Sequence, residues 1–299
     1  MLPEVYRQFS APGINANNDN AYLLAIAAIC PPPRTSQRLV LEVGGNKGYA
    51  IPRYNFIWGN LDVQLVFDNI KALQKNVIMW RPNLLTVEVF EPTRSAVNVL
   101  YHLLQHVQSL MHVHINHNGV SDVEGQETFY TPYANVGDEG AHMGHTAGLP
   151  ESGPIEKAQV VTLDMFMKRK YPAGFPGPIV FVKVDTEGFD ALVIKGMRNL
   201  LEQHSVWAFQ FEFNTAWKDG RTKHPESIKE LGDWLAVLGY ACYKWIYDVN
   251  NTAGAIRWNG PEHWDDRVEN LDGFDAFCID TTLPCYQRFE AAFKWQQEV

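Results

Sequence analysis

The segment Leu39-Val-Leu-Glu-Val-Gly-Gly-Asn-Lys-Gly48 decides the fold, because an apolar run ends there in an acidic residue and a glycine-rich turn. Two later segments repeat this pattern: Leu84–Phe90 precedes an acidic residue, Glu91, and Ile179–Val184 precedes the carboxylate cluster Asp185–Asp190. The carboxyl ends of parallel strands lie at one edge of a sheet, where α/β proteins bind ligands. The sequence therefore predicts an α/β sheet whose carboxyl edge binds a ligand with hydroxyl and amino groups.

Length and composition favour one large domain with an N-terminal extension. The chain has 299 residues, of which 46% are hydrophobic and 20% are charged, as is ordinary for a protein with a sizeable core. Strand and helix patterns run almost without interruption from residue 38 onward. We therefore expect residues 1–37 to form an arm and a helix that packs on the core, and residues 38–299 to form a single domain.

Charge and hydropathy exclude two classes of partner. The formal net charge is −9, and Lys and Arg never occur four in a row, so we expect no nucleic-acid partner. No apolar run approaches the roughly 20 residues that span a bilayer. The apolar run Ala21–Cys30 follows an Asn-rich stretch without basic residues and stops at Pro31–Pro33, which is typical of a short helix and not of a signal peptide. The expected protein is cytoplasmic and has no membrane span.

The four cysteines predict neither a disulfide framework nor a metal site. They stand at positions 30, 242, 278 and 285, and none belongs to a C-x-x-C pair or to a regular spacing with histidines. Such isolated cysteines are typical of core or surface thiols. We therefore expect all of them to be unpaired.

The rest of the chain alternates between helix and strand patterns. We expect helices at about 93–108, 190–203 and 226–238, and strands at 113–116 and 206–213. Two β-like runs near the C-terminus, 241–247 and 274–280, are expected to pair as an antiparallel hairpin. Residues 134–156 hold five glycines and two prolines, so we expect a mobile surface loop there, a lid over the ligand being one role for it.

The glycine-rich turn suggests which ligand binds. Gly44, Gly45 and Gly48 let the backbone approach a ligand closely, with Asn46 between them. Dinucleotide-binding turns read G-x-G-x-x-G and hold a pyrophosphate, but the second spaced glycine is missing here. Glu42 would also repel a pyrophosphate, whereas it suits a cationic ligand. S-adenosylmethionine carries a sulfonium, an amino group and a ribose diol, and is such a ligand.

Glu91 completes this interpretation. An acidic residue at the end of the second strand accepts hydrogen bonds from both ribose hydroxyls in a bidentate manner. The alternative is an acid that stabilises the N-terminus of the following helix through the macrodipole. We expect Glu42, Gly44, Gly45, Asn46, Gly48 and Glu91 to bind the cofactor.

Five blocks in order resemble the FkbM family of S-adenosylmethionine-dependent methyltransferases. They are Glu42–Gly48, Val89–Pro92, Gly119–Gly125, Val161–Asp164 and Val182–Asp190, and the last of these, with Asp-x-Glu-Gly, is the most distinctive. The resemblance covers roughly residues 38–215. It implies a Rossmann-like class I methyltransferase fold with a mostly parallel sheet, and methyl transfer to a hydroxyl of a sugar, glycan or polyketide-like small molecule.

The resemblance also implies roles for single residues. Gly44, Gly48 and Glu91 match cofactor-contacting positions, and Ser121 and Asp122 match a turn that approaches the adenine. Gly48 and Glu91 are farther apart than the usual spacing of about 20 residues, which indicates an insertion within 49–83. That insertion either lines the acceptor pocket or packs in the core.

Catalysis requires a group that removes the proton of the acceptor hydroxyl. We expect Asp185 and Glu187 in this role, because they follow a strand whose end should lie beside the transferred methyl group. Glu212, His142 and His145 are further candidates. Two alternatives remain: Glu187 could instead cap the next helix, or Mg²⁺ could bind between acidic strand ends, held by Asp185, Glu212 and Asn214.

Two other functions compete with methyl transfer. A nicotinamide-dependent reductase would also use Glu91 for a ribose, but the glycine spacing and Glu42 count against it. A non-catalytic binding module could retain the fold without the chemistry. The identity of the acceptor and the oligomeric state do not follow from the sequence.

Overall fold

A computed structural model describes most of residues 26–58 and 84–293. Its gaps lie at 28, 34, 47, 49, 52–53, 55–57, 105–110, 132–141, 144–154, 215–226, 248–252, 265–267 and 269–272. The N-terminal arm before residue 26, most of the insertion within 49–83 and most of the glycine-rich segment 134–156 therefore lie outside the described residues.

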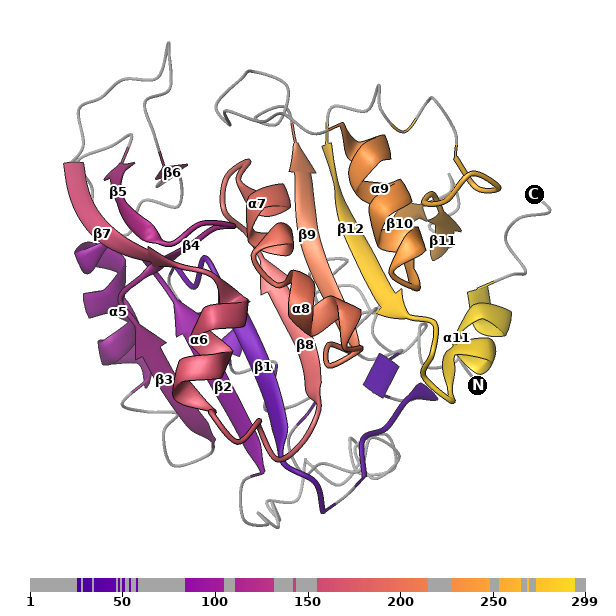
Figure 1. The fold of residues 1–299 in the computed structure, drawn as a ribbon, viewed down its shortest axis with the longest axis horizontal. Helices are drawn as coiled ribbons and strands as arrows, with labels where there is room; N and C mark the ends of the chain where they lie inside the picture. The colour runs from indigo at the N-terminus through magenta and orange to yellow at the C-terminus, as the bar shows by residue number, and fades with distance from the viewer. Residues whose placement is uncertain are drawn as a thin grey trace.

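The centre of the molecule is an eight-stranded sheet with the order β11-β10-β12-β9-β8-β1-β2-β3. Figure 1 shows it from β3 on one side to β11 on the other. Pairing is parallel from β3 through β9 and antiparallel at β12, β10 and β11. The strands are β1 (Arg38–Val43), β2 (Leu85–Phe90), β3 (His112–Asn116), β8 (Ile179–Val184), β9 (Ala208–Asn214), β10 (Tyr240–Tyr247), β11 (Ala253–Arg257) and β12 (Gly273–Asp280).

The strand order confirms the predicted fold class. If β11 is set aside, the seven remaining strands run 6-7-5-4-1-2-3 in sheet order, with the seventh antiparallel to its neighbours. This is the arrangement of class I methyltransferases. The predicted C-terminal pairing is also confirmed, because Tyr240 to Lys244 of β10 lie opposite Asp280 to Ala276 of β12. Strand β11, which was not predicted, continues the sheet beyond β10.

Helices cover both faces of this sheet. Side chains at alternate positions of β1 point to opposite faces of the sheet, and each face has its own apolar core. Leu39 and Leu41 pack in the core of the first face, and Val40 packs in the core of the second. The helices of the first face are α6 (Leu163–Lys170), α7 (Asp190–Lys195), α8 (Arg198–Glu202) and α9 (Ile228–Val237), which lie in front of the sheet in Figure 1. The helices of the second face are α5 (Arg94–Leu104) and α11 (Tyr286–Phe293).

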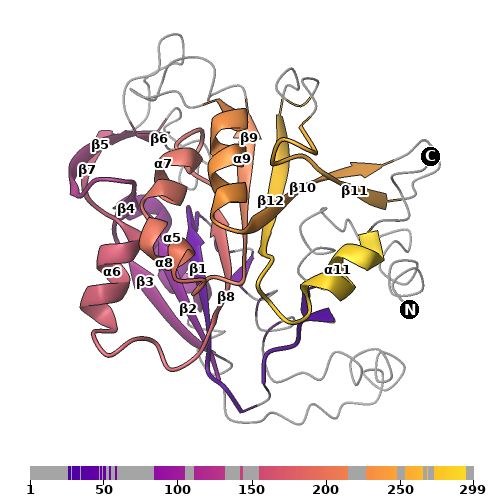
Figure 2. The same cartoon turned by 45° about the vertical axis from the view of Figure 1, so that its right-hand side comes forward.

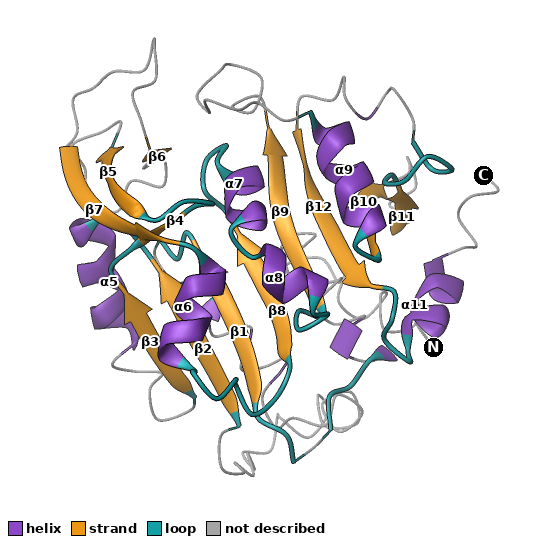
Figure 3. Ribbon diagram, viewed as in Figure 1, coloured by secondary structure: helices purple, strands orange, loops and turns teal. Residues whose placement is uncertain are grey.

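A second, smaller sheet stands at the carboxyl edge of the first one and was not predicted. Its order is β4-β7-β5-β6, with β4 (Gly119–Val120), β5 (Gly125–Tyr130), β6 (His142–Met143) and β7 (Ile155–Val161). Figure 2 and Figure 3 show it beside the ends of the central strands. Its own apolar cluster is small, consisting of Phe129, Ala158, Val160 and Met143.

Two predicted helices have different bounds in the structure. The segment predicted as one helix at 190–203 divides into α7 and α8 around Gly196. A Cβ atom on Gly196 would lie 2.1 Å from the carbonyl oxygen of Ser121, so the two backbones approach closely here and leave no space for a side chain. Helix α9 begins after Ser227, whose hydroxyl and the carboxylate of Glu230 form a capping box.

The cysteine prediction was wrong, because the structure pairs all four residues. Cys30 is joined to Cys285, and Cys242 is joined to Cys278. Cys242 and Cys278 occupy directly opposed positions on β10 and β12, so strand pairing brings them together. Spacing along the chain carries no information on such long-range proximity, which is the reason for the error.

A buried carboxylate of β2 is hydrogen-bonded to residues at the end of α6. Glu88 is fully buried and accepts hydrogen bonds from Lys170 Nζ at 2.6 Å, Tyr171 Oη at 2.5 Å and Asn116 Nδ2 at 3.0 Å. Glu88→Ala should lower the free energy of unfolding by about 2–4 kcal/mol, because it leaves the donors of a partly buried network without their acceptor. Denaturant unfolding followed by circular dichroism measures this loss.

The same helix offers a matched control. Arg169 binds Glu124 at 2.7 Å, with the Arg169 side chain 57% exposed. Such exposed ion pairs contribute about 0–1 kcal/mol, so Glu124→Ala should leave stability nearly unchanged. Equal losses for the two variants would show that the Glu88 network adds nothing beyond a surface pair.

In the described part of the chain, no helix has the length and apolarity needed to span a bilayer.

Candidate active site

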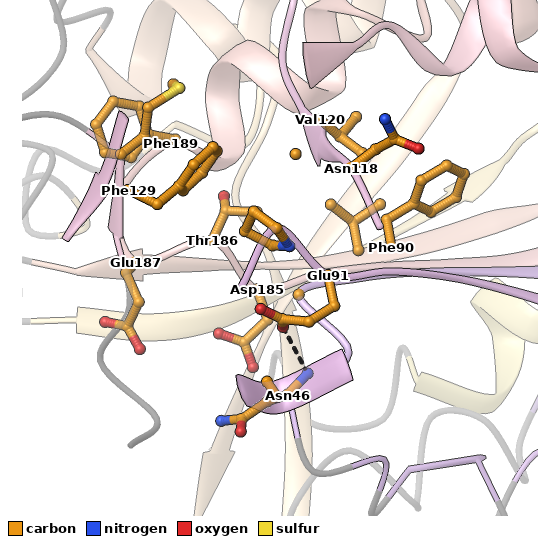
Figure 4. Close-up of a pocket in the computed structure, with 16 residues that line it drawn as sticks. Asn46, Phe90, Glu91, Asn118, Val120, Phe129, Asp185, Thr186, Glu187 and Phe189 are labelled. Atoms are coloured by element: carbon orange, nitrogen blue, oxygen red, sulfur yellow. Dashed lines mark hydrogen bonds between the residues drawn. The ribbon is translucent and has the colours of Figure 1, made fainter. Parts of the chain in front are cut away.

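A pocket opens at the carboxyl edge of the central sheet, where the turns after β1, β2 and β8 meet. Five of the residues predicted for the site line it: Gly44, Asn46, Glu91, Asp185 and Glu187. Figure 4 shows Asn46, Glu91 and Asp185 grouped together, with the rings of Phe129 and Phe189 at another part of the wall. Segments far apart in the sequence thus meet in one cavity, as the strand ends predicted.

The glycine turn after β1 packs directly on the turn after β8. Gly44 has φ +82°, and a Cβ atom there would lie 1.8 Å from the carbonyl oxygen of Asp185. At Gly45 a Cβ would lie 2.2 Å from the side chain of Val89. Gly48 has φ +73° and faces Leu100. Gly44 thus forms the pocket wall, whereas Gly45 and Gly48 support the turn from behind.

Glu91 is held in place by neighbouring groups. It is 4% exposed, and its Oε1 accepts hydrogen bonds from the backbone N of Thr93 at 2.9 Å and the Thr93 hydroxyl at 2.6 Å. Its Oε2 accepts from the backbone N of Asn46 at 3.0 Å (Figure 4). Burial raises the pKa of Glu91, and the bonds from Thr93 and Asn46 oppose that rise. These hydrogen bonds therefore fix the orientation of the Glu91 carboxylate in the pocket wall.

Glu42 lies behind the pocket wall and is paired with other groups. It is buried, accepts a hydrogen bond from the Tyr54 hydroxyl, and lies 3.9 Å from Lys183 Nζ. The same ammonium group is 2.8 Å from Asp185 Oδ2. Lys183 therefore connects the acidic residue of the first strand with the carboxylate that follows β8. Sequence reasoning missed Lys183, although a lysine inside an apolar strand was a visible signal.

The turn from Asp185 to Asp190 has an unusual backbone. Glu187 has φ +55° and Gly188 has φ +99°, so two successive residues are left-handed, which is uncommon for a glutamate. The first helical residue of α7 is Asp190, and its N-cap is Phe189, without a side-chain hydrogen bond. Glu187 is therefore not the N-cap of that helix and instead contributes to the pocket wall.

A buried carboxyl stands behind this turn. Asp190 is fully buried, accepts from the Thr186 hydroxyl at 2.9 Å through Oδ2, and accepts from the backbone N of Glu212 at 3.1 Å through Oδ1. Burial and then the charge of Asp185 raise the pKa of Asp190 to about 7. Sequence reasoning cited Asp190 as part of a motif but gave it no role, because its burial was not visible.

A second cavity adjoins the first. Asp185 and Glu187 line both cavities, and the second is completed mainly by polar side chains: Lys183, Gln210, Glu212 and Asp275. Glu212 and Asp275 are paired in register on β9 and β12. The two catalytic candidates therefore stand where the cavities meet.

Ser121 and Asp122 do not line the described pocket. The Ser121 hydroxyl donates to Asp122 Oδ1 at 3.1 Å, and the Ser121 backbone packs on Gly196. The residues just before them, Asn118, Gly119 and Val120, line the wall together with Phe129 and Met143 of the small sheet. Sequence reasoning missed this wall, because β5 and β6 were not predicted.

Within the described residues, no three His, Cys, Asp or Glu side chains are grouped as a metal site. The proposed set of Asp185, Glu212 and Asn214 therefore gains no support as a magnesium centre. The side chains of Asn214 and His142, and all of His145, lie outside the described residues.

The strand order and the glycine turn define the chain as a class I methyltransferase in fold. The model of the methyltransferase FkbM domain matches residues 43–242, more than half of the chain. The chain belongs to the FkbM methyltransferase family. This confirms the resemblance inferred from the motifs. No match was found among curated proteins.

Solved structures with a similar fold are distant in sequence. Methyltransferase FkbM from Methylobacillus flagellatus KT is 13% identical, with a TM-score of 0.39, over 82% of this chain and 44% of that chain. This chain thus spans less than half of that protein. An rRNA methylase from Streptococcus thermophilus is 7% identical, with a TM-score of 0.37, over 87% of this chain and 92% of its own. A precorrin-6y C5,15-methyltransferase from Geobacter metallireducens GS-15 is 7% identical, with a TM-score of 0.35, over 90% and 91%.

Proposed function

We propose that this protein uses S-adenosylmethionine to methylate a hydroxyl group of a sugar, glycan or polyketide-like small molecule. The observation that carries the proposal is the grouping of Glu91, Asn46 and Asp185 around one pocket at the carboxyl edge of the sheet. The family and fold imply the cofactor. The acceptor class rests on the family resemblance and on the polar second cavity.

The residues present fit the cofactor. Glu91 offers carboxylate oxygens to the hydroxyl groups of a ribose. Asn46 Oδ1 is buried without a hydrogen-bond partner, and Asn46 lines the pocket, so a donor on the ligand would satisfy it. Gly44 lets the turn after β1 pack against the backbone of Asp185, so both turns contribute to one pocket wall. Ser121 and Asp122 remain candidates for adenine contacts.

The chemistry then depends on alignment and proton removal. Bound S-adenosylmethionine supplies an electrophilic methyl group. Asp185 and Glu187 lie where the two cavities meet, so they can orient an acceptor hydroxyl that reaches from the second cavity into the first. The ion pair with Lys183 holds the Asp185 carboxylate in place, so Asp185 and Glu187 are positioned either to take up the hydroxyl proton themselves or to align the hydroxyl for a base behind them.

The second cavity favours a hydroxylated acceptor over an apolar one. Its lining includes the carboxylates of Asp185, Glu212 and Asp275 and the amide of Gln210. Carboxylates and amides recognise hydroxyl groups through hydrogen bonds, whereas an apolar acceptor would leave them desolvated. The net charge of −9 on the whole chain argues against an RNA acceptor.

Calorimetry with S-adenosylmethionine and with NADH separates the proposed function from a reductase, because the methyltransferase should bind S-adenosylmethionine and a reductase should bind NADH. A non-catalytic module is separated by its failure to release S-adenosylhomocysteine. Release of S-adenosylhomocysteine in the presence of a panel of hydroxylated small molecules then identifies the acceptor. A protein that binds NADH and not S-adenosylmethionine would refute the proposal.

Glu91→Ala should weaken S-adenosylmethionine binding by about 10- to 100-fold. The loss of hydrogen bonds between a charged group and the ribose costs about 1.5–3 kcal/mol. Calorimetric titration of the folded variant measures the change.

Thr93→Val serves as the matched control for this prediction. It removes the 2.6 Å hydrogen bond to Glu91 Oε1 but keeps the carboxylate. Cofactor affinity should then change much less than in Glu91→Ala. If Glu91→Ala folds and binds the cofactor as tightly as the wild type, Glu91 does not contact the ribose.

A further inference from the structure

We propose that the proton of the acceptor hydroxyl passes through the Thr186 hydroxyl to the buried carboxyl of Asp190. The inference rests on the proposed function and adds a catalytic residue, Thr186, and a buried proton acceptor, Asp190. Neither was predicted from the sequence.

The geometry connects the pocket to Asp190 through one hydroxyl group. Thr186 lines the cofactor pocket, and its Oγ1 donates a hydrogen bond of 2.9 Å to Asp190 Oδ2. Asp190 Oδ1 accepts from the backbone N of Glu212 at 3.1 Å. A backbone N–H does not relay a proton, whereas a hydroxyl can accept one proton while it gives up another. Since Asp190 is fully buried, a substrate reaches it through Thr186.

The surroundings of Asp190 favour proton uptake near neutral pH. The ionisable groups that face it are Asp185 and Glu212, on the ends of β8 and β9. Lys183 of β8 is paired with Asp185, and Asp275 of β12 lies opposite Glu212. Burial, followed by the charge of Asp185, raises the pKa of Asp190 to about 7. A carboxyl whose pKa lies close to the working pH is well suited to accept a proton.

The step balances without a further reactant. The acceptor oxygen bonds to the methyl carbon, and the sulfur keeps the electron pair of the broken carbon–sulfur bond. The hydroxyl proton moves to Thr186 Oγ1 while the proton of Thr186 moves to Asp190 Oδ2. Asp190 becomes neutral, and the same path in reverse returns the proton to water after the products leave. Asp185 aligns the acceptor in this scheme.

Three variants test the relay. Asp190→Asn can still accept from the Glu212 N–H and can donate to Thr186, so it preserves the local structure but cannot take up a proton. Thr186→Val removes the hydroxyl in a side chain of nearly the same shape, and Thr186→Ser retains it. Turnover should fall by about 10²-fold or more in the first two variants and by less than about tenfold in Thr186→Ser. Affinity for S-adenosylmethionine should stay within a few-fold in all three.

Turnover is measured as release of S-adenosylhomocysteine with neutral hexoses and 6-deoxyhexoses as probes. If Asp190→Asn and Thr186→Val keep wild-type turnover while Asp185→Asn is inactive, the relay is overturned and the proposed function stands. If the wild type does not bind S-adenosylmethionine, the proposed function itself fails.

A second readout needs no acceptor. In protein labelled with carboxyl-¹³C aspartate, Asp190→Asn identifies the Asp190 signal in nuclear magnetic resonance spectra. This signal should titrate near pH 7 in the wild type. A carboxyl that is already ionised well below that pH overturns the relay, whether or not any probe sugar is methylated.

Discussion

Replacement of Asp185 by Asn is expected to lower turnover by about 10²-fold or more while cofactor affinity stays within a few-fold. Asp185 lines both cavities and is paired with Lys183 at 2.8 Å, so its carboxylate is fixed where the acceptor should meet the methyl group. Asn has the same shape but cannot take up a proton or carry the charge that orients a hydroxyl. Steady-state kinetics and calorimetry measure the two quantities.

Asp233→Asn is the matched control for this prediction. Asp233 is paired with Lys229 on α9 and lines neither cavity, so the same chemical change there should leave turnover unaltered. Addition of EDTA to the wild type distinguishes a protein-only site from a magnesium site, because only the latter predicts inhibition. Wild-type turnover in a folded Asp185→Asn variant would show that neither proton removal nor alignment depends on this residue.

The central strands could be predicted because each is marked by a local sequence pattern. Parallel strands buried on both faces read as continuous apolar runs. An acidic residue follows β2 and β8, and the glycine turn follows β1, and the fold brings these three turns to one edge of the sheet. Gly44, Glu91 and Asp185 could therefore be assigned to one site from the sequence alone. Their common position depends only on strand direction and sheet order.

The supporting contacts were not predictable, because each depends on tertiary packing. Lys183 lies within an apolar strand, and only the sheet register shows that it reaches both Glu42 and Asp185. The role of Asp190 depends on its complete burial behind β8 and β9. Strand β5 carries exposed polar residues and little apolar alternation, so its pairing with β7 lacked a clear pattern.

The disulfides are the feature in which sequence reasoning failed most clearly, and they bear on the cellular compartment. Disulfides persist in oxidising compartments and are rare in the cytosol. Two disulfides in this structure therefore argue against the cytoplasmic expectation. Alkylation of the denatured, unreduced protein followed by mass spectrometry should find no free thiol, whereas four alkylated cysteines would contradict the pairing.

Loss of the bridge between Cys30 and Cys285 should lower the free energy of unfolding by about 2–5 kcal/mol. This bridge connects residues 255 positions apart and joins the segment before β1 to the residue just before α11, so it restricts nearly the whole unfolded chain. Cys30→Ser, Cys285→Ser and the double variant should lose similar amounts, because each of them removes the same bond. Denaturant unfolding measures these losses. If the single losses add up in the double variant, the two cysteines contribute separately and the bridge does not stabilise the protein.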